Sequence, residues 1–144
     1  MSKAASFDMT VHVRDHCLCL AAQRAARSLA RRFDEALRPV GLTSGQFSLL
    51  TSLNRPEPPS VGEVADVLGM DRTTLTANLK PLERRGLVEI LVDPVDRRSR
   101  LVKLSAAGLE ALEAATPIWV QIHAEVEGLL DRPEDIRGGL RALA

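Results

Sequence analysis

The sequence predicts a mainly α-helical chain with one small β-hairpin. Apolar side chains recur at helical spacing over several segments, most clearly over residues 72–84. Residues that can cap a helix with a side-chain oxygen stand just ahead of these segments. Two aliphatic runs, 87–92 and 101–104, flank the tetrapeptide DPVD at 93–96, which is typical of a turn. We expect the 144 residues, 45% of them hydrophobic, to form a single domain over 1–144.

The first helix is expected over residues 14–38. Apolar side chains keep helical spacing along it, and Pro39 ends it. A second helix is expected to begin after Thr43, because Thr43 and Gln46 can form a capping box in which each side chain bonds the other residue's backbone N–H. The loop NRPEPPS, residues 54–60, separates this helix from the next pair.

Two short helices are expected on either side of Gly69. Ser60 can accept a hydrogen bond from the backbone N–H of Glu63, whose carboxylate can reach back to the Ser60 amide. Glycine takes the left-handed conformation that ends a helix at little steric cost, and Asp71 can cap a new helix two residues later. This spacing predicts a helix-turn-helix.

The second of these helices has two different faces. Leu75, Leu79 and Leu82 recur at i, i+4 and i+7, so they must face a core. The outer face is small near its start and basic throughout. Short hydroxyl and methyl side chains let a helix enter the major groove of DNA, and arginine or lysine can pair with guanine or phosphate. The residues predicted to contact DNA from this helix are Arg72, Thr73, Thr76, Ala77, Lys80 and Arg84.

The hairpin carries a basic tip. Arginine on an exposed hairpin beside a reading helix can reach the minor groove or the adjacent phosphates. We expect Asp96 to hydrogen-bond the guanidinium of Arg98 and fix its direction. The helix pair and this hairpin, within residues 43–104, predict a winged helix-turn-helix that binds double-stranded DNA. The wing residues assigned to DNA are Asp96, Arg97, Arg98 and Arg100.

The C-terminal part predicts two further helices. Ser105 can cap a long helix, and Pro117 inside it should kink it or split it in two. A last helix follows Pro133. Terminal helices of this length, within 14–38 and 105–144, cannot all be buried in a small winged domain. We therefore expect them to be dimerisation helices that pair with a second subunit in a homodimer.

Four stretches of the chain carry a family resemblance: LTSGQFSLL at 42–50, residues 71–76, LERRGLVEI at 82–90 and DPVDRRSRLVKLSAAG at 93–108. With them, the chain resembles the MarR family of winged-helix transcriptional regulators over nearly its whole length. The last of the four stretches resembles the family's Asp-x-Arg wing. The resemblance implies a repressor that binds a short palindromic operator as a homodimer and leaves it when a small molecule or an oxidant alters the dimer.

An effector pocket is expected by analogy with family members that bind small, often aromatic and anionic, molecules beside the dimer helices. Cys17 falls near the reactive cysteine of peroxide-sensing members, so a cysteine-based redox-sensing regulator is the alternative. Those members orient the cysteine with tyrosine hydroxyls, and this chain has no tyrosine, so a small-molecule effector ranks first. On this analogy, the other residues that could line the pocket are His16, Arg24, Gln46, Trp119 and His123.

Charge is distributed unevenly, although the formal net charge is zero. Between Arg72 and Arg100 seven basic residues face four acidic ones, whereas from Ser105 onward seven acidic residues face three arginines. The half assigned to DNA is therefore basic. A winged-helix module for protein association would instead need an apolar outer face on its second helix, so it is less favoured.

Motifs of enzymes are missing from the sequence. It has no glycine-rich phosphate loop, no G-x-S-x-G and no H-E-x-x-H, so we assign no catalytic residue and no cofactor. His12, His16 and Cys19 stand at i, i+4 and i+7, but a helical rise of about 10 Å separates the first from the last, so we assign no metal. No run approaches 18 apolar residues and the N-terminus lacks the apolar stretch of a signal peptide, so we expect a cytoplasmic protein without a membrane partner.

Overall fold

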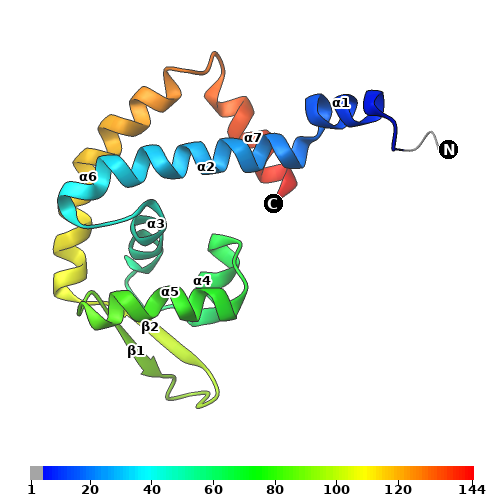
Figure 1. Ribbon diagram of the computed structural model, residues 1–144. Helices are drawn as coiled ribbons and strands as arrows, with labels where there is room; N and C mark the ends of the chain where they lie inside the picture. Colours follow the sequence, from blue (N-terminus) through cyan, green and yellow to red (C-terminus); the bar gives the residue numbers. More distant parts are fainter. Residues whose placement is uncertain (1–4) are drawn as a thin grey trace.

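The computed structural model describes residues 5–144, which are mostly helical with a single two-stranded hairpin in that range (Figure 1). The predicted class, mainly α with a β-hairpin wing, is therefore confirmed. No helix within residues 5–144 is long and apolar enough to cross a membrane. The elements are α1 (Phe7–His16), α2 (Leu18–Leu37), the 3₁₀ turn η2 (Arg38–Val40), α3 (Ser44–Leu53), α4 (Val61–Leu68), α5 (Arg72–Arg84), β1 (Val88–Val92), β2 (Arg100–Leu104), α6 (Ala106–Glu127) and α7 (Pro133–Leu143).

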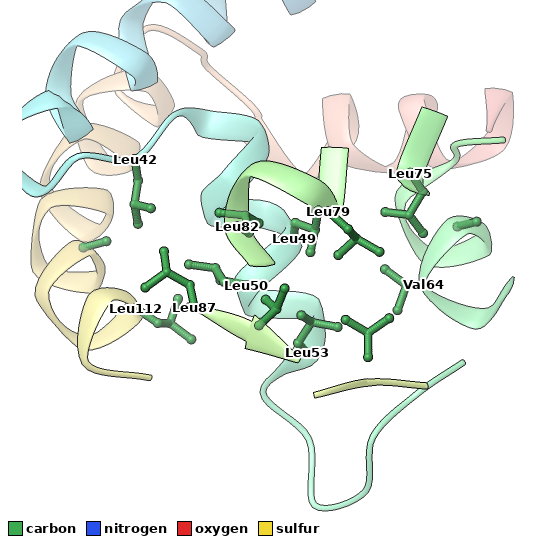
Figure 2. Close-up of a cluster of buried hydrophobic side chains, with 14 of the residues drawn as sticks. Leu42, Leu49, Leu50, Leu53, Val64, Leu75, Leu79, Leu82, Leu87 and Leu112 are labelled. Carbon is green, nitrogen blue, oxygen red and sulfur yellow. The ribbon is translucent and has the colours of Figure 1, made fainter. Parts of the chain in front are cut away.

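The hydrophobic core lies between α3, α4, α5 and the hairpin, with the end of α2 and the first half of α6 closing it. Figure 2 shows leucines from α3, α5 and α6 pointing into this shared interior. Leu75, Leu79 and Leu82 are fully buried there, as the helical spacing predicted. Burying three leucines fixes the rotation of α5 about its axis, and so its opposite face must point to solvent.

The predicted helix over 14–38 is wrong in two respects, because the helical region starts earlier and is broken at Cys17. Ser6 caps α1 by accepting the N–H of Met9 at 3.2 Å. Cys17 then adopts extended backbone angles, and its sulfur accepts the N–H of Leu20 at 3.4 Å. The cysteine thus acts as the N-cap of α2, a role that Ser, Thr, Asp or Asn usually fills.

The predicted caps of α3 and α4 are confirmed in three of their four hydrogen bonds. Thr43 and Gln46 form both arms of a capping box, at 3.1 Å each. Ser60 Oγ accepts the N–H of Glu63 at 3.1 Å, but the Glu63 carboxylate bonds the Ser60 hydroxyl at 3.3 Å instead of its amide. The guanidinium of Arg55, 3.7 Å from the other Glu63 oxygen, draws the carboxylate away from the backbone.

The wing is an antiparallel hairpin that is fixed to the helix-turn-helix. Ile90 pairs with Val102 near the middle of the two strands. The N–H of Val102 also donates to the carbonyl of Pro59 at 2.9 Å, and Ser60 forms an isolated bridge with Leu101. The segment just before α4 therefore extends the hairpin, which sets the direction of the wing relative to α4.

The long helix α6 is bent but not split. It runs unbroken past Pro117, and Figure 1 shows it changing direction partway along its length. Proline has no N–H to donate and its ring crowds the preceding turn, which accounts for the bend. Gly108 allows the first turn to approach the core closely, because a β-carbon there would lie 2.1 Å from the carbonyl oxygen of Leu87.

The last helix, α7, is held to α6 by charge. Arg137 of α7 donates to Glu127 of α6 at 2.6 Å and also to Glu134. These hydrogen bonds raise the pKa of Arg137, and the bond from Arg137 lowers the pKa of Glu134. None of the side chains of α7 is buried, although Ile136, Leu140 and Leu143 form an apolar stripe along it.

Candidate DNA-binding surface

The turn between α4 and α5 is built as the sequence predicted. Gly69 ends α4 in the left-handed conformation, with φ of 64°. Asp71 caps α5, since its two carboxylate oxygens accept the N–H and the hydroxyl of Thr74, each at 2.8 Å. The hydrogen bond from the Thr74 backbone N–H lowers the pKa of Asp71, and the hydrogen bond from the Thr74 hydroxyl lowers it further. The carboxylate is therefore ionised at neutral pH.

The outer face of α5 is exposed along its whole length. Near its N-terminus it presents Thr73, Thr76 and Ala77, and further on it presents Lys80 and Arg84. The hydroxyl of Thr76 donates to the carbonyl of Arg72 at 2.8 Å, so it offers solvent a methyl group and oxygen lone pairs. This surface has short side chains near its start and cationic ones further along. It therefore suits insertion into a major groove between the two sugar–phosphate backbones.

The wing tip corrects one predicted contact. Asp96 accepts the backbone N–H of Arg98 at 3.0 Å, not a bond from the Arg98 guanidinium. Its neighbour Asp93 does the same for Val95 at 2.9 Å, so the two aspartates shape the loop as consecutive turns. The guanidinium of Arg100 folds back onto the carbonyls of Arg97 and Ser99, at 3.1 and 3.3 Å. Asp96 therefore belongs to the scaffold of the wing.

The basic side chains of α5 and the wing lack acidic partners. Within residues 5–144 the ion pairs involve Arg14, Arg55, His123, Arg132 and Arg137. A cation without an ion pair keeps its full charge for a phosphate group. The residues in this part of the chain that retain it are Arg72, Lys80, Arg84, Arg97, Arg98 and Arg100.

Two residues that were not predicted from the sequence, Arg85 and Gly62, contribute to the position of α5 and of its first side chain. Arg85, at the C-terminal end of the helix, donates to the carbonyl of Gly41 at 2.9 Å. Gly62, in the first turn of α4, lies directly beneath the guanidinium of Arg72. Arg85 and Gly41 are 44 residues apart, so no local pattern reveals their contact. A glycine at an early helical position, beside an arginine that starts the next helix, was the available signal for Gly62.

The six residues predicted for an effector pocket are dispersed within one chain. Trp119 and His123 stack with ring centroids 4.4 Å apart. The Gln46 side chain is used in capping α3, and Arg24 lines a separate hollow on the surface of α2. His16 stacks on His12 in α1, and Cys17 lies at the break between α1 and α2.

Trp119 borders two hollows of different size. The larger, of about 520 Å³, lies between α3, the end of α4 and α6. The smaller, of about 260 Å³, lies between α2, α3 and α6, and both are also lined by Phe47 and Ser48. The break at Cys17 interrupts the helical face expected to carry His12, His16 and Cys19. No group of three or more His, Cys, Asp or Glu side chains that could hold a metal ion occurs in the described part of the chain.

The fold and this surface define a class of protein, the winged helix-turn-helix regulators that bind DNA. The sequence profile of the MarR family matches residues 40–99. The multiple antibiotic resistance protein MarR of Escherichia coli is 36% identical over 97 residues, which cover 67% of each chain. The chain belongs to the MarR family of transcriptional regulators.

Other relatives agree with this assignment. The transcriptional activatory protein BadR of Rhodopseudomonas palustris is 35% identical over 109 residues, which cover 73% of this chain but only 62% of BadR. The crystal structure of the regulator MosR of Mycobacterium tuberculosis in complex with DNA has a TM-score of 0.83 and 38% identity, and the match covers 89% of this chain and 93% of that one. The chain is therefore similar to DNA-bound regulators over nearly all of its length, and its relatives are not enzymes.

Proposed function

We propose that the protein is a repressor that binds a palindromic operator as a homodimer and is released by a small-molecule effector. The observation that carries the proposal is the exposed face of α5, where small side chains at the start and unpaired cations at the end lie beside an arginine-tipped wing. Small uncharged side chains such as Thr73, Thr76 and Ala77, with cations beside them, let a helix reach base edges between phosphates. Because the proposed partner is DNA, we place the site of action in the cytoplasm.

The terminal helices support the dimer. None of the side chains of α1 or α7 is buried, although several of them are apolar. Phe7, for example, is 79% exposed and Leu143 is 68% exposed. Exposed apolar stripes of this kind mark association surfaces. A second copy that covers α1, α7 and the outer part of α2 would bury them.

The hollow beside Trp119 supports control by a ligand. Its volume of about 520 Å³ is in the range of small-molecule sites. Val67 and Leu68, which line it, are the last residues of α4 before the turn into α5, whereas Thr116 and Trp119 come from α6. A molecule seated there would contact both the helix-turn-helix and a long helix that reaches the dimer region, and so could change their relative position.

The lining favours an aromatic effector without a negative charge. Trp119 and Phe47 supply rings, and none of the residues that line the hollow is a lysine or arginine. Thr51, Ser52 and Thr116 have already donated their hydroxyl protons to backbone carbonyls, at 2.8, 2.6 and 2.8 Å. Their oxygens are therefore left as acceptors, which suit ligand N–H or O–H groups.

A second candidate is control by oxidation of Cys17. Its sulfur caps α2 at the break between two helices of the proposed dimer region. Oxidation of that sulfur would alter the cap, and so the angle between α1 and α2.

Selection from random duplexes at moderate salt tests the DNA-binding part of the proposal. We expect an inverted repeat to be enriched, with half-sites about 10 bp apart from centre to centre. Selection that enriched no sequence, or only a single half-site, would contradict a dimer that reads an operator.

A further inference from the structure

The guanidinium of Arg72 lies against Gly62 of the neighbouring helix. Its Nη2, Cζ and Nε atoms are 2.7, 3.1 and 3.3 Å from the position that a β-carbon on residue 62 would occupy. Gly62 is the second residue of α4, so the planar group covers the first turn of that helix. A real β-carbon does not approach another atom to 2.7 Å, so this placement of Arg72 needs a glycine at position 62.

We infer that Gly62 is a positioning residue for DNA binding. It seats the guanidinium of Arg72 over the N-terminal end of α4, where the group meets the sugar–phosphate backbone beside the major groove and not a base edge. The inference rests on the proposed binding of duplex DNA. From the sequence, Arg72 could pair with either guanine or phosphate. The inference narrows the predicted partner of Arg72 to phosphate.

The backbone of Gly62 gives no other reason for a glycine. Among residues 5–144 the glycines with positive φ are Gly41, Gly69 and Gly86, so Gly62 has ordinary helical angles. Glycine in a helix is less stable than alanine because it loses more conformational freedom on folding. Gly62 therefore weakens α4 and is not needed for the backbone geometry of the helix. The guanidinium of Arg72, which lies against it, gives the reason for a glycine at this position.

The charges around Arg72 favour a phosphate as its partner. Glu63, the acidic residue in the first turn of α4, is bonded to Ser60 and faces Arg55 at 3.7 Å. Arg72 forms no ion pair within the described residues. A cation beside the positive end of a helix dipole is repelled by it, and an anion between the two relieves that repulsion. In a helix-turn-helix the first helix crosses the DNA backbone, so a phosphate is available there.

Four variants test the inference: Gly62→Ala, Arg72→Ala, the double variant, and Gly45→Ala as the matched control. Gly45 is the second residue of α3, and the nearest atom to a β-carbon there would be 4.0 Å away. Each protein is assayed for thermal unfolding, for operator affinity at several salt concentrations and for base preference. A non-specific duplex is measured alongside.

We expect Gly62→Ala to unfold at or above the wild-type temperature, because a flexible arginine can move aside. We also expect it to bind operator about tenfold more weakly, as Arg72→Ala does. In both, the slope of log affinity against log salt should fall by about 1, with base preference unchanged. The double variant should be no weaker than either single variant, and Gly45→Ala should match the wild type.

Wild-type affinity and salt slope in Gly62→Ala would overturn the inference. So would losses from the two single variants that add in the double variant, or an altered base preference in Arg72→Ala. The non-specific duplex separates this failure from failure of the proposed function. If the wild type selects no operator, operator recognition is contradicted. If Gly62 positions Arg72, the affinities of the variants for the non-specific duplex still differ from that of the wild type. A wild type that binds no duplex would overturn both.

Discussion

The guanidinium of Arg85 donates a hydrogen bond of 2.9 Å to the carbonyl of Gly41, and so joins the C-terminal end of α5 to the segment that follows α2. Gly41 is in the left-handed conformation, with φ of 71°, which turns its carbonyl toward the arginine. The recognition helix is thus tied directly to the end of a helix in the proposed dimer region.

Replacing Arg85 with alanine should lower the free energy of unfolding by about 1 kcal/mol, the usual contribution of one such hydrogen bond. Urea unfolding measures the loss. Arg84→Ala is the matched control, because Arg84 is exposed on the outer face of α5. It should weaken DNA binding and leave stability unchanged. An unfolding midpoint for Arg85→Ala equal to that of the wild type would show that the contact does not hold in solution.

The wing should act mainly through phosphate and minor-groove potential. Arg98→Ala is expected to weaken binding to all duplexes and to reduce the salt slope by about 1. Lys80→Ala should do the same from the major groove. Fluorescence anisotropy at several salt concentrations measures both, with Arg132→Ala as a control because Arg132 is an exposed arginine outside α5 and the wing whose guanidinium faces Asp135. If Arg98→Ala kept the affinity and slope of the wild type, the wing would have no part in binding.

Base preference should depend on the small residues near the start of α5. Changing Thr73, Thr76 or Ala77 is expected to alter which bases are preferred, at about 1 to 3 kcal/mol for each lost base contact. Competition between single-base variants of the operator measures the change. A uniform loss on all variants, with the order of preference kept, would place these residues away from the bases.

Local hydrogen bonding explains which features could be predicted from the sequence. The caps at Thr43, Ser60, Asp71 and Ser105 use partners three residues away, so their spacing is visible in the chain. The leucine stripe of α5 has the same local character. These short-range patterns were sufficient to predict the helix-turn-helix.

Non-local contacts and unusual caps explain the features that could not be predicted. A sulfur cap at Cys17 breaks a segment whose apolar spacing continues on both sides. Arg55 draws Glu63 away from its expected partner, and Asp96 bonds the nearer backbone in place of a side chain. The proposed effector hollow is lined from three helices that are adjacent only in the fold.

Acid should test the cap of α5. The hydrogen bonds from Thr74 lower the pKa of Asp71 in the folded state. A depressed pKa contributes stability that is present above the ordinary pKa of about 3.9 and is lost as the pH falls through the folded value. Asp71→Asn keeps a capping oxygen but does not titrate. Its stability should therefore fall less than that of the wild type below about pH 4. Parallel stability curves of the two proteins over that range would contradict this role of Asp71.

The single tryptophan of the chain reports on the proposed effector hollow. Uncharged aromatic compounds with N–H or O–H groups should change Trp119 fluorescence more strongly than aromatic carboxylates do. A ligand that releases DNA must bind the operator complex more weakly, by the same factor by which it lowers operator affinity. Equal ligand affinity for the free and operator-bound protein would rule out that ligand as the inducer.

Hydroperoxide separates the two modes of regulation. If a small molecule is the signal, organic hydroperoxide should leave the wild type on its operator, and Cys17→Ser should behave in the same way. Release of the wild type alone by peroxide would instead identify Cys17 as the sensor. A chelator arm serves as the control, and operator binding should be unchanged by it because no metal-binding group occurs among residues 5–144.

The most direct test of the central claim varies the spacing of the operator half-sites. Two α5 helices held in one dimer require half-sites about 10 bp apart, on the same face of the duplex. An insertion of about 5 bp turns one half-site to the opposite face, so it should reduce affinity to that for a single half-site. Sedimentation should at the same time find two chains on each intact operator. Equal affinity for both spacings, or one chain on each operator, would contradict a dimer that reads DNA with paired recognition helices.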